Sequence, residues 1–170
     1  MIRAEIWDAY DKEFNKIENV TLIRGEDIPK DMHHLVSEII VKHKDGTYLL
    51  MQRDFEKSLG GKWEVTAGGA ALKGETSLDC AIRELREETG IISDELKEIG
   101  RIVHDGYQTI FVEYLCITDW HKDDITLQNG ETIDYKWVDK DTLLEIDDEM
   151  IASPRTLELI RKCKCTFDGI

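Results

Sequence analysis

Short apolar segments separated by polar turns run through most of the chain and predict a fold rich in β-strands. Segments 34–43 (HLVSEIIVKH) and 47–53 (TYLLMQR) flank the turn KDG, a pattern typical of a β-hairpin. Within the first segment, the run 38–41 (EIIV) shows no alternation of apolar and polar residues. Such a run predicts a strand that is covered on both sides.

The remaining pattern predicts further strands and three helices. Strands are predicted at 4–11, 18–25, 63–69, 96–105, 107–118 and 131–138, and the first two form a hairpin around a polar turn. Helices are predicted at 77–89, at 142–146 with Asp141 as the cap, and at 155–163 after Pro154. Mixed strands with few helices indicate an α/β (α+β) sandwich around a mixed β-sheet.

The helix at 77–89 has signals at both ends. Thr76 with Asp79 three residues later resembles a capping box, and Gly90 stands where a helix C-cap belongs. At about 100° per residue, one side of the helix is apolar and is predicted to pack on the sheet. Its residues are Leu78, Ala81, Ile82 and Leu85.

Three carboxylates converge beside this apolar side. Glu84, Glu87 and Glu88 stand at positions i, i+3 and i+4, so they share one arc and repel one another. Glu87 and Glu88 also lie in the last turn, where the helix dipole disfavours acids, although Arg83 can brace Glu87. A solvated acidic face is the simpler interpretation of these three residues alone. A divalent cation would relieve both conflicts, and such oxygen ligands suit Mg²⁺ or Mn²⁺.

Length and composition are those of an ordinary globular domain. The 170 residues are 41% hydrophobic and 34% charged, so we predict a single domain over 1–170 with the N-terminal hairpin as an extension at about 1–30. The sequence lacks the run of about 18 apolar residues that spans a membrane, and residues 1–14 lack the apolar core of a secretion signal. We therefore expect a cytoplasmic protein without a membrane partner.

Charge and cysteine content narrow the class of partner. Acidic residues outnumber basic ones by 36 to 22, for a net charge of −14, which disfavours binding to nucleic acid. A small phosphorylated substrate is compatible with this charge when divalent cations mediate the encounter. The four cysteines form no C-x-x-C pair and are predicted to be reduced. A soft-metal site at Cys163 and Cys165 is a weak alternative, because no histidine lies nearby.

Residues 69–91 carry a motif with fixed spacing. Five residues separate Gly69 from Glu75, and seven more precede the run RELREETGI at 83–91. This arrangement resembles the complete signature of the Nudix hydrolases, with its aliphatic positions filled by Leu85 and Ile91. The predicted strands and the C-terminal helix are compatible with the fold of that family.

The resemblance implies hydrolysis of a pyrophosphate bond in a nucleoside diphosphate linked to another group, with Mg²⁺ or Mn²⁺ bound. Its substrate would be a small nucleotide or diphosphate. The metal would be held by four groups: the carboxylates of Glu84, Glu87 and Glu88 and the carbonyl of Gly69. Arg83 would orient the carboxylates and Glu75 would pair with it. Gly68 and Gly69 would let the backbone approach the site closely.

Other candidate site residues are less specific. Members of the family often add an acid from a later loop, for which Glu131 is the candidate and Glu113 the runner-up. Which carboxylate is the general base stays open. Arg53 and Lys62 are candidates to bind a substrate phosphate. Tyr107 is a candidate to stack on a base, although a hairpin aromatic is the simpler interpretation. The four tryptophans are interpreted as packing residues: Trp7, Trp63, Trp120 and Trp137.

One alternative function is isomerisation. The N-terminal block 5–36, including the pair His33-His34, resembles the branch of Nudix proteins close to isopentenyl diphosphate isomerase. Those isomerases use a catalytic cysteine in the segment before the helix, whereas this chain has WEVTAGGA there. Cys80 lies inside the helix and is interpreted as a small packing residue. The missing cysteine therefore argues against an isomerase, and no catalytic role is assigned to the histidine pair.

A second alternative is a non-catalytic Nudix module that binds a nucleotide and regulates a partner. Such modules are expected to lose metal-binding carboxylates, and this chain keeps every acid of the signature. The sequence determines neither the substrate nor the oligomeric state. The N-terminal hairpin is a candidate contact for a homodimer.

Overall fold

The structure, a computed structural model, describes residues 4–162. The strands in this range are β1 (Ile6–Tyr10), β2 (Lys16–Ile23), β3 (His34–His43), β4 (Tyr48–Arg53), β5 (Trp63–Glu64), β6 (Thr66–Ala70), β7 (Leu96–His104), β8 (Thr109–Thr118) and β9 (Thr132–Val138). The α-helices are α1 (Ser77–Thr89), α2 (Lys140–Glu145) and α3 (Pro154–Lys162). Three short 3₁₀ turns join them at Asp105–Tyr107, Lys122–Asp124 and Asp148–Met150.

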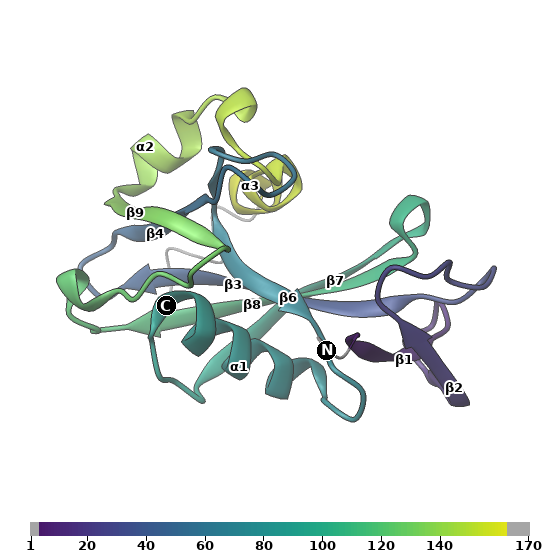
Figure 1. Cartoon of the computed structure of the whole chain (residues 1–170). Coiled ribbons are helices and arrows are strands. Elements are labelled where there is room, and N and C mark those ends of the chain that lie inside the picture. The colour runs from purple at the N-terminus through teal and green to yellow at the C-terminus, as the bar shows by residue number, and fades with distance from the viewer. Residues whose placement is uncertain (1–3, 163–170) are drawn as a thin grey trace.

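A mixed sheet forms the centre of the molecule (Figure 1). Its main path runs in the order β5-β4-β3-β8-β7, while β6 pairs with β3 and β9 pairs with β4. β3 and β8 are parallel over ten residue pairs, from His34–Thr109 to His43–Thr118. The other pairs in this sheet are antiparallel. The predicted mixed sheet is therefore confirmed.

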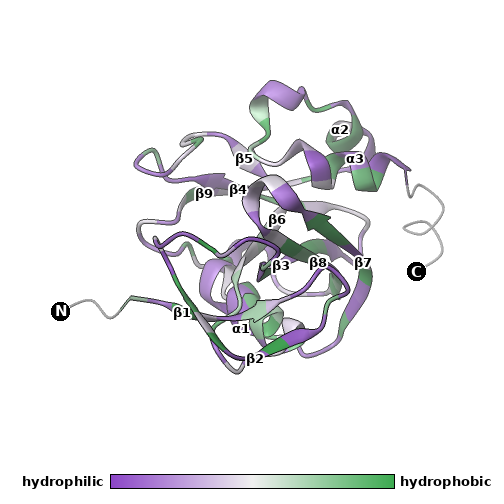
Figure 2. Cartoon of the chain, turned by 90° about the vertical axis from the view of Figure 1, so that its right-hand side faces the viewer, coloured by the Kyte–Doolittle hydropathy of each residue, from purple (hydrophilic) through white to green (hydrophobic). Residues whose placement is uncertain are grey.

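Helices cover both faces of this sheet, α1 on one side and α2 with α3 on the other (Figure 1). The side chains of β3 show why. Ile39 and Val41 belong to the core under α1, whereas Ile40 belongs to the core that includes residues of α2 and α3. Figure 2 shows the hydrophobic colour concentrated on the central strands. The predicted two-sided burial of the run EIIV and the sandwich architecture are both confirmed.

β1 and β2 form a separate antiparallel sheet, which confirms the predicted N-terminal hairpin. Trp7, Ala9 and Leu22 form a small core of their own. The backbones of Tyr10 and His33 exchange two hydrogen bonds of 2.9 Å, which connect β1 to the residue before β3. Further hydrogen bonds join β1 to the segment before α1. One of them runs from the Lys73 amide to the Ile6 carbonyl. The hairpin is therefore placed next to the start of α1.

α1 has the predicted bounds and caps. Thr76 and Asp79 form the reciprocal capping box, with backbone-to-side-chain distances of 3.0 and 3.1 Å, and Gly90 adopts the left-handed conformation at φ +80°. The predicted packing of Leu78 is wrong, because it is 38% exposed. The face turned to the sheet instead passes through Cys80, which is fully buried, as its predicted packing role requires.

Two local predictions are corrected. The cap of α2 is Asp139, which accepts a hydrogen bond of 2.8 Å from the Thr142 amide, and Asp141 lies inside the helix. Segment 63–69 is not one strand, because β5 pairs with β4 whereas β6 pairs with β3.

Among residues 4–162, no helix combines the length and apolar character that crossing a membrane requires. The cysteines at 163 and 165 lie outside the described residues.

Candidate active site

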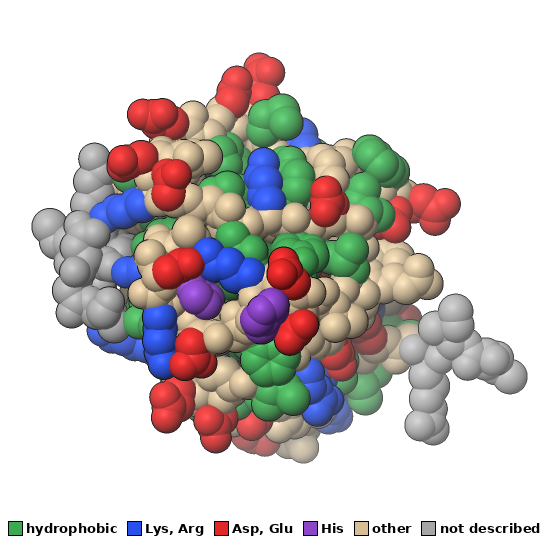
Figure 3. Space-filling view, turned by 90° about the vertical axis from the view of Figure 1, so that its left-hand side faces the viewer, with side chains coloured by type: hydrophobic (Ala, Val, Ile, Leu, Met, Phe, Trp, Pro, Cys, Tyr) green, Lys and Arg blue, Asp and Glu red, His purple; other side chains and the backbone are tan. Residues whose placement is uncertain are grey.

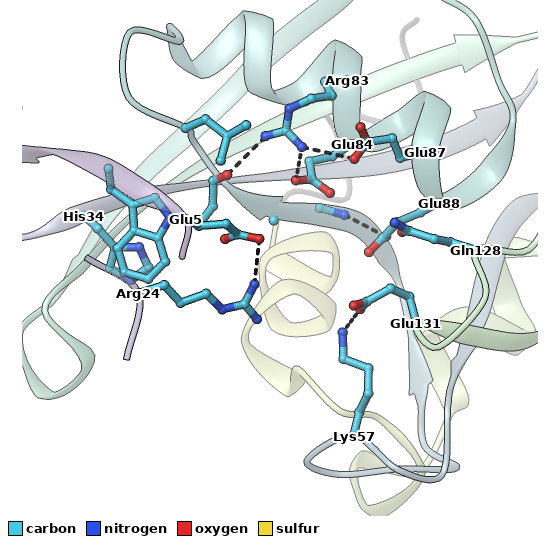
Figure 4. Close-up of a pocket in the computed structure, with 15 residues that line it drawn as sticks. Glu5, Arg24, His34, Lys57, Arg83, Glu84, Glu87, Glu88, Gln128 and Glu131 are labelled. Atoms are coloured by element: carbon cyan, nitrogen blue, oxygen red, sulfur yellow. Dashed lines mark hydrogen bonds and ion pairs between the residues drawn. The ribbon is translucent and has the colours of Figure 1, made fainter. Parts of the chain in front are cut away.

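A cavity of about 410 Å³ lies between α1, β6, the N-terminal hairpin and the loop before β9 (Figure 4). Charged side chains from distant parts of the sequence meet on its wall. They are Glu5, Arg24, Lys57, Arg83, Glu84, Glu87, Glu88 and Glu131. The structure therefore gathers the predicted carboxylates of α1 and the predicted later acid, Glu131, in one place.

Arg83 organises the carboxylates at the start of this wall. Its guanidinium donates two hydrogen bonds to Glu75, at 2.7 and 2.9 Å, which confirms the predicted pair. It also donates to Glu84 at 2.5 Å and to Glu87 at 3.2 Å. A further bond of 3.1 Å reaches the Ala70 carbonyl on β6. The planar fork of an arginine suits this multiple contact, which fixes α1 to the strand before it.

Glu88 is the most buried carboxylate of the cavity, with 7% of its surface exposed. Its Oε2 accepts a hydrogen bond of 3.0 Å from the Gly68 amide. Burial raises the pKa of Glu88 to about 8, and the nearby charge of Glu64 adds to the increase, while the Gly68 amide opposes it. A bound cation would stabilise the charged form of an acid in these surroundings.

Gly68 and Gly69 allow the close approach predicted for them. A Cβ at Gly68 would lie 2.3 Å from the carbonyl oxygen of Ser37, and one at Gly69 would lie 2.5 Å from Oε1 of Glu84. A larger residue at either position would displace the neighbouring strand or the Glu84 carboxylate. The Gly69 carbonyl accepts a weak hydrogen bond of 3.4 Å from the Cys80 thiol, and its role as a metal ligand stays a prediction.

The donor set fits Mg²⁺ or Mn²⁺, which bind to oxygen ligands. Burial raises the pKa of Glu84 as well as that of Glu88, although Arg83 counteracts the effect at Glu84. Within residues 4–162, no three Asp, Glu, His or Cys side chains are already close enough to form a finished metal site. Arg83 binds Oε1 of Glu84 and the Gly68 amide binds Oε2 of Glu88, so each carboxylate would have to turn its other oxygen toward a shared ion.

Glu131 reaches the cavity from the loop before β9. It forms an ion pair with Lys57, and its carbonyl accepts a hydrogen bond of 2.9 Å from the Asp54 amide. Figure 4 shows Glu131 near Glu88, with Lys57 on its other side. The location is compatible with the predicted role of an additional acid, and that role stays a prediction.

The two cations predicted to bind phosphate, Arg53 and Lys62, are not among the described residues that line the cavity. Arg53 forms an ion pair with the largely buried Glu64 and donates a hydrogen bond of 2.9 Å to the Ser58 carbonyl. Lys57 takes a position in the cavity wall instead. Residues 53–62 carry three cations, and their positions in the sequence did not show that Lys57 is the one that faces the cavity.

Glu113 and Tyr107 also lie outside the cavity wall. Glu113 is fully buried and forms an ion pair with Arg155 of α3. Tyr107 is 71% exposed and stacks on His104 with ring centroids 4.3 Å apart, in agreement with a hairpin aromatic. Glu131 is therefore the better placed of the two later acids.

The sequence interpretation missed the contribution of the N-terminal hairpin to the cavity. Glu5 and Arg24 form an ion pair of 2.8 Å on its wall. Trp7 packs in the small core of the hairpin, as interpreted, but its ring also lines the cavity and stacks on His34 with centroids 4.3 Å apart. No local signal marks these residues, because the contact depends on how the hairpin docks beside α1.

Comparisons with known proteins agree with this geometry. The NUDIX domain model matches residues 32–159. An uncharacterized Nudix hydrolase of Listeria monocytogenes, lmo0368, is 34% identical over 141 residues, which cover 82% of each chain. The CTP pyrophosphohydrolase of Escherichia coli is 32% identical over 116 residues, covering 67% of this chain and 81% of that protein. The crystal structure of DR0079 from Deinococcus radiodurans has a TM-score of 0.75 at 19% identity, covering 94% of this chain and 99% of that one.

The matched domain covers more than half of the chain, so the protein belongs to the Nudix hydrolase family. Its class is that of the pyrophosphohydrolases, enzymes that act on phosphoanhydride bonds. The resemblance of residues 69–91 to the family signature is confirmed. The resemblance of the N-terminal block to the isomerase branch stays a prediction.

Proposed function

We propose that the protein is a Mg²⁺- or Mn²⁺-dependent Nudix hydrolase that cleaves a pyrophosphate bond in a nucleoside diphosphate-linked or related diphosphate substrate. The observation that carries this proposal is the convergence of Glu84, Glu87 and Glu88 beside Gly69 in one cavity. Relatives such as the CTP pyrophosphohydrolase support a nucleotide as the substrate. The same acids argue against a purely regulatory module, and the absence of cysteine in segment 63–70 argues against an isomerase.

In this proposal the metal is held by the carboxylates of α1 together with the Gly69 carbonyl. When bound, the metal would neutralise charge on the pyrophosphate and lower the pKa of the attacking water. Arg83 keeps Glu84 and Glu87 in position through its bonds to Glu75 and Ala70.

The protein also supplies a cation and an additional acid. Lys57 lies on the cavity wall, where burial and the charge of Arg53 lower its pKa from the usual value, while Glu88 and Glu64 oppose the decrease. We assign the first phosphate contact to Lys57. Arg53 and Lys62 are secondary candidates, because Arg53 is already engaged by Glu64. Glu131 would then exchange its ion pair with Lys57 for a role as base or extra ligand.

A comparison of the wild type with Glu88→Gln tests the proposal. We expect Mg²⁺-dependent release of products from a panel of nucleoside di- and triphosphates and nucleotide sugars, and no turnover with chelator. Losing one metal ligand is expected to lower kcat by on the order of 10³-fold, equivalent to several kcal/mol of transition-state stabilisation. Thermal unfolding checks that the variant is folded.

Glu95→Gln is the matched control, because Glu95 is exposed and is not part of the cavity wall. It should retain full activity. Turnover that persists in chelator, or that is unchanged in Glu88→Gln, would contradict the proposal.

Three further predictions belong with this function. We infer a cytoplasmic location and no nucleic-acid partner, in keeping with acidic side chains that are spread over the surface, as on the face in Figure 3. A homodimer through the N-terminal hairpin stays open. Light scattering coupled to size exclusion measures the oligomeric state directly.

A further inference from the structure

The turn at residues 72–75 places Glu75 beside Arg83, and two hydrogen bonds of its own close it. The Glu75 amide donates to the Leu72 carbonyl at 2.9 Å, and the Leu72 amide donates to Oε2 of Glu75 at 2.8 Å. Gly74 adopts the left-handed conformation at φ +90°. Among residues 4–162, no atom beyond its neighbours in the chain lies within 4 Å of the position that a Cβ of Gly74 would take. Packing does not fix the turn on this side, so its position depends on hydrogen bonds to other elements.

Strand β1 supplies the acceptors for the two remaining amides of this turn. The Lys73 amide donates to the Ile6 carbonyl at 2.9 Å, and the Gly74 amide donates to Oδ2 of Asp8 at 2.8 Å. All four amides at residues 72–75 are thereby paired, two inside the turn and two with the N-terminal hairpin. Of the two acceptors on β1, Asp8 is the one that depends on the identity of a side chain.

Asp8 is a strong acceptor in a protected place. Its side chain is 4% exposed, and the same Oδ2 forms an ion pair of 2.9 Å with Lys16 of β2. Burial opposes the ionisation of Asp8, but the hydrogen bond from Gly74 and the contact with Lys16 lower its pKa below the usual value. The carboxylate is therefore ionised near pH 7, and a hydrogen bond from an amide to an ionised carboxylate is stronger than one to a neutral oxygen.

The residue that follows Gly74 is the one that holds Arg83. Glu75 accepts hydrogen bonds of 2.7 and 2.9 Å from the guanidinium, which also binds two carboxylates of α1. A displacement of the Gly74 backbone moves Glu75 with it, because one peptide bond joins them. Asp8 is therefore connected to the carboxylates of α1 through the turn, Glu75 and Arg83, and each step is a bond or a direct contact.

We propose that Asp8 is a positioning residue of the hydrolase, which holds Glu75 in place through the Gly74 amide and thereby keeps Arg83 and the carboxylates proposed to bind the metal in position. The hairpin then supports the active site as well as lining the cavity. Without this bond the turn keeps its internal hydrogen bonds but can shift relative to α1. The effect on the metal rests on the proposed function, whereas the effect on Arg83 does not require a metal.

Two measurements on Asp8→Ala test the inference, and neither requires turnover. In NMR spectra recorded without metal, the side-chain Nε–H of Arg83 should exchange with solvent about tenfold faster than in the wild type, in line with the loss of one hydrogen bond. Its absence from the spectrum of Arg83→Lys assigns this signal. In calorimetry, the Kd for Mn²⁺ should rise about tenfold, near the lower limit for residues that orient metal ligands.

Asp8→Asn separates positioning from a general loss of stability. Asparagine keeps an acceptor oxygen for the Gly74 amide but loses the ion pair with Lys16. Urea unfolding should therefore show lower stability for both Asp8→Asn and Asp8→Ala. The exchange at Arg83 and the Kd for Mn²⁺ should return toward the wild-type values in Asp8→Asn alone.

Thr21→Val is the matched control, because it removes the hydrogen bond from Lys73 to Thr21, a second contact between the hairpin and the same turn. It should leave both measurements unchanged. The inference is overturned if Asp8→Ala leaves either the exchange at Arg83 or the affinity for Mn²⁺ unchanged, or if Thr21→Val has the same effects as Asp8→Ala. If the wild type binds no Mn²⁺, the proposed function fails, and the exchange at Arg83 alone decides the inference.

Discussion

Two arginine-centred clusters of glutamates differ mainly in their surroundings, because one lines the cavity and the other connects α3 to the sheet. In the first, Arg83 of α1 binds Glu75, Glu84 and Glu87 beside the cavity. In the second, Arg155 of α3 binds Glu113 and donates a hydrogen bond of 2.7 Å to Glu38.

The first cluster lies on the face of the sheet that α1 covers, and the second involves the helix on the other face (Figure 1).

The difference between the clusters shows why similar groups have different functions. Glu38 and Glu113 are register partners on the parallel strands β3 and β8, and Glu113 is fully buried. Arg155 therefore connects α3 to the centre of the sheet, and it is not among the residues that line the cavity. The Arg83 cluster comes largely from one helix and opens on the cavity. An arginine between glutamates thus connects a helix to the sheet in one place and, under the proposed function, positions metal ligands in the other.

Replacing Arg155 with Met would give the largest effect on stability. Removing one partner from a buried ion cluster leaves the negative charge of the Glu38–Glu113 pair uncompensated, and we expect the free energy of unfolding to fall by about 3 kcal/mol. Activity per folded molecule should be unchanged, because Arg155 is not in the cavity wall. Urea unfolding and steady-state kinetics at a temperature where the variant is folded measure the two quantities. Arg101→Met is the control, since its exposed pair with Glu98 should contribute less than about 1 kcal/mol.

Replacing Arg83 with Lys should affect activity more than stability. Lysine keeps one charge but cannot reach Glu75, Glu84 and Glu87 together, so the carboxylates proposed to bind the metal lose their common support. We expect kcat/KM to fall about 10- to 100-fold, as for other residues that orient metal ligands, with an increase in the Mg²⁺ concentration needed for half activity. Titration of activity with Mg²⁺ checks this. If Arg83→Lys loses stability but keeps its Mg²⁺ dependence, the Arg83 cluster has the same structural role as the Arg155 cluster.

The sequence was sufficient to predict the parts of the site that lie on one element. Local signals at residues 76–90 predicted α1 and its capping box, whereas the pair between Arg83 and Glu75 and the close approach at the glycines were implied by the resemblance of residues 69–91 to the Nudix signature. The two-sided burial of β3 was equally predictable from an apolar run without alternation.

The contacts between distant elements were not predictable from one sequence. Arg53 and Lys57 lie four residues apart, and the sequence does not show that Arg53 pairs with Glu64 of β5 while Lys57 lines the cavity. Glu113 matched the pattern of an extra acid, yet the side of the sheet on which it meets Arg155 depends on how α3 packs. The role of the hairpin required knowing that β1 docks beside the segment before α1.

Glu113→Gln gives a smaller effect that depends on pH and separates the clusters further. Burial and the charge of Glu38 raise the pKa of Glu113 to about 8, despite Arg155, whereas an unfolded glutamate titrates near its usual value of about 4.3. The folded state therefore binds this proton more tightly. The stability that the proton contributes is present below about pH 4 and is lost as pH rises through about 8.

Glutamine resembles the protonated acid, so the variant should lose less stability than the wild type between pH 5 and pH 9. Urea unfolding at both pH values in the presence of chelator measures the difference. The carboxylates of α1 are common to both proteins, so their titration cancels from the comparison. If the stability of the wild type and of Glu113→Gln depends on pH in the same way, Arg155 keeps Glu113 ionised over the whole range. The Arg155 cluster would then be held together by charge pairing, as the Arg83 cluster is.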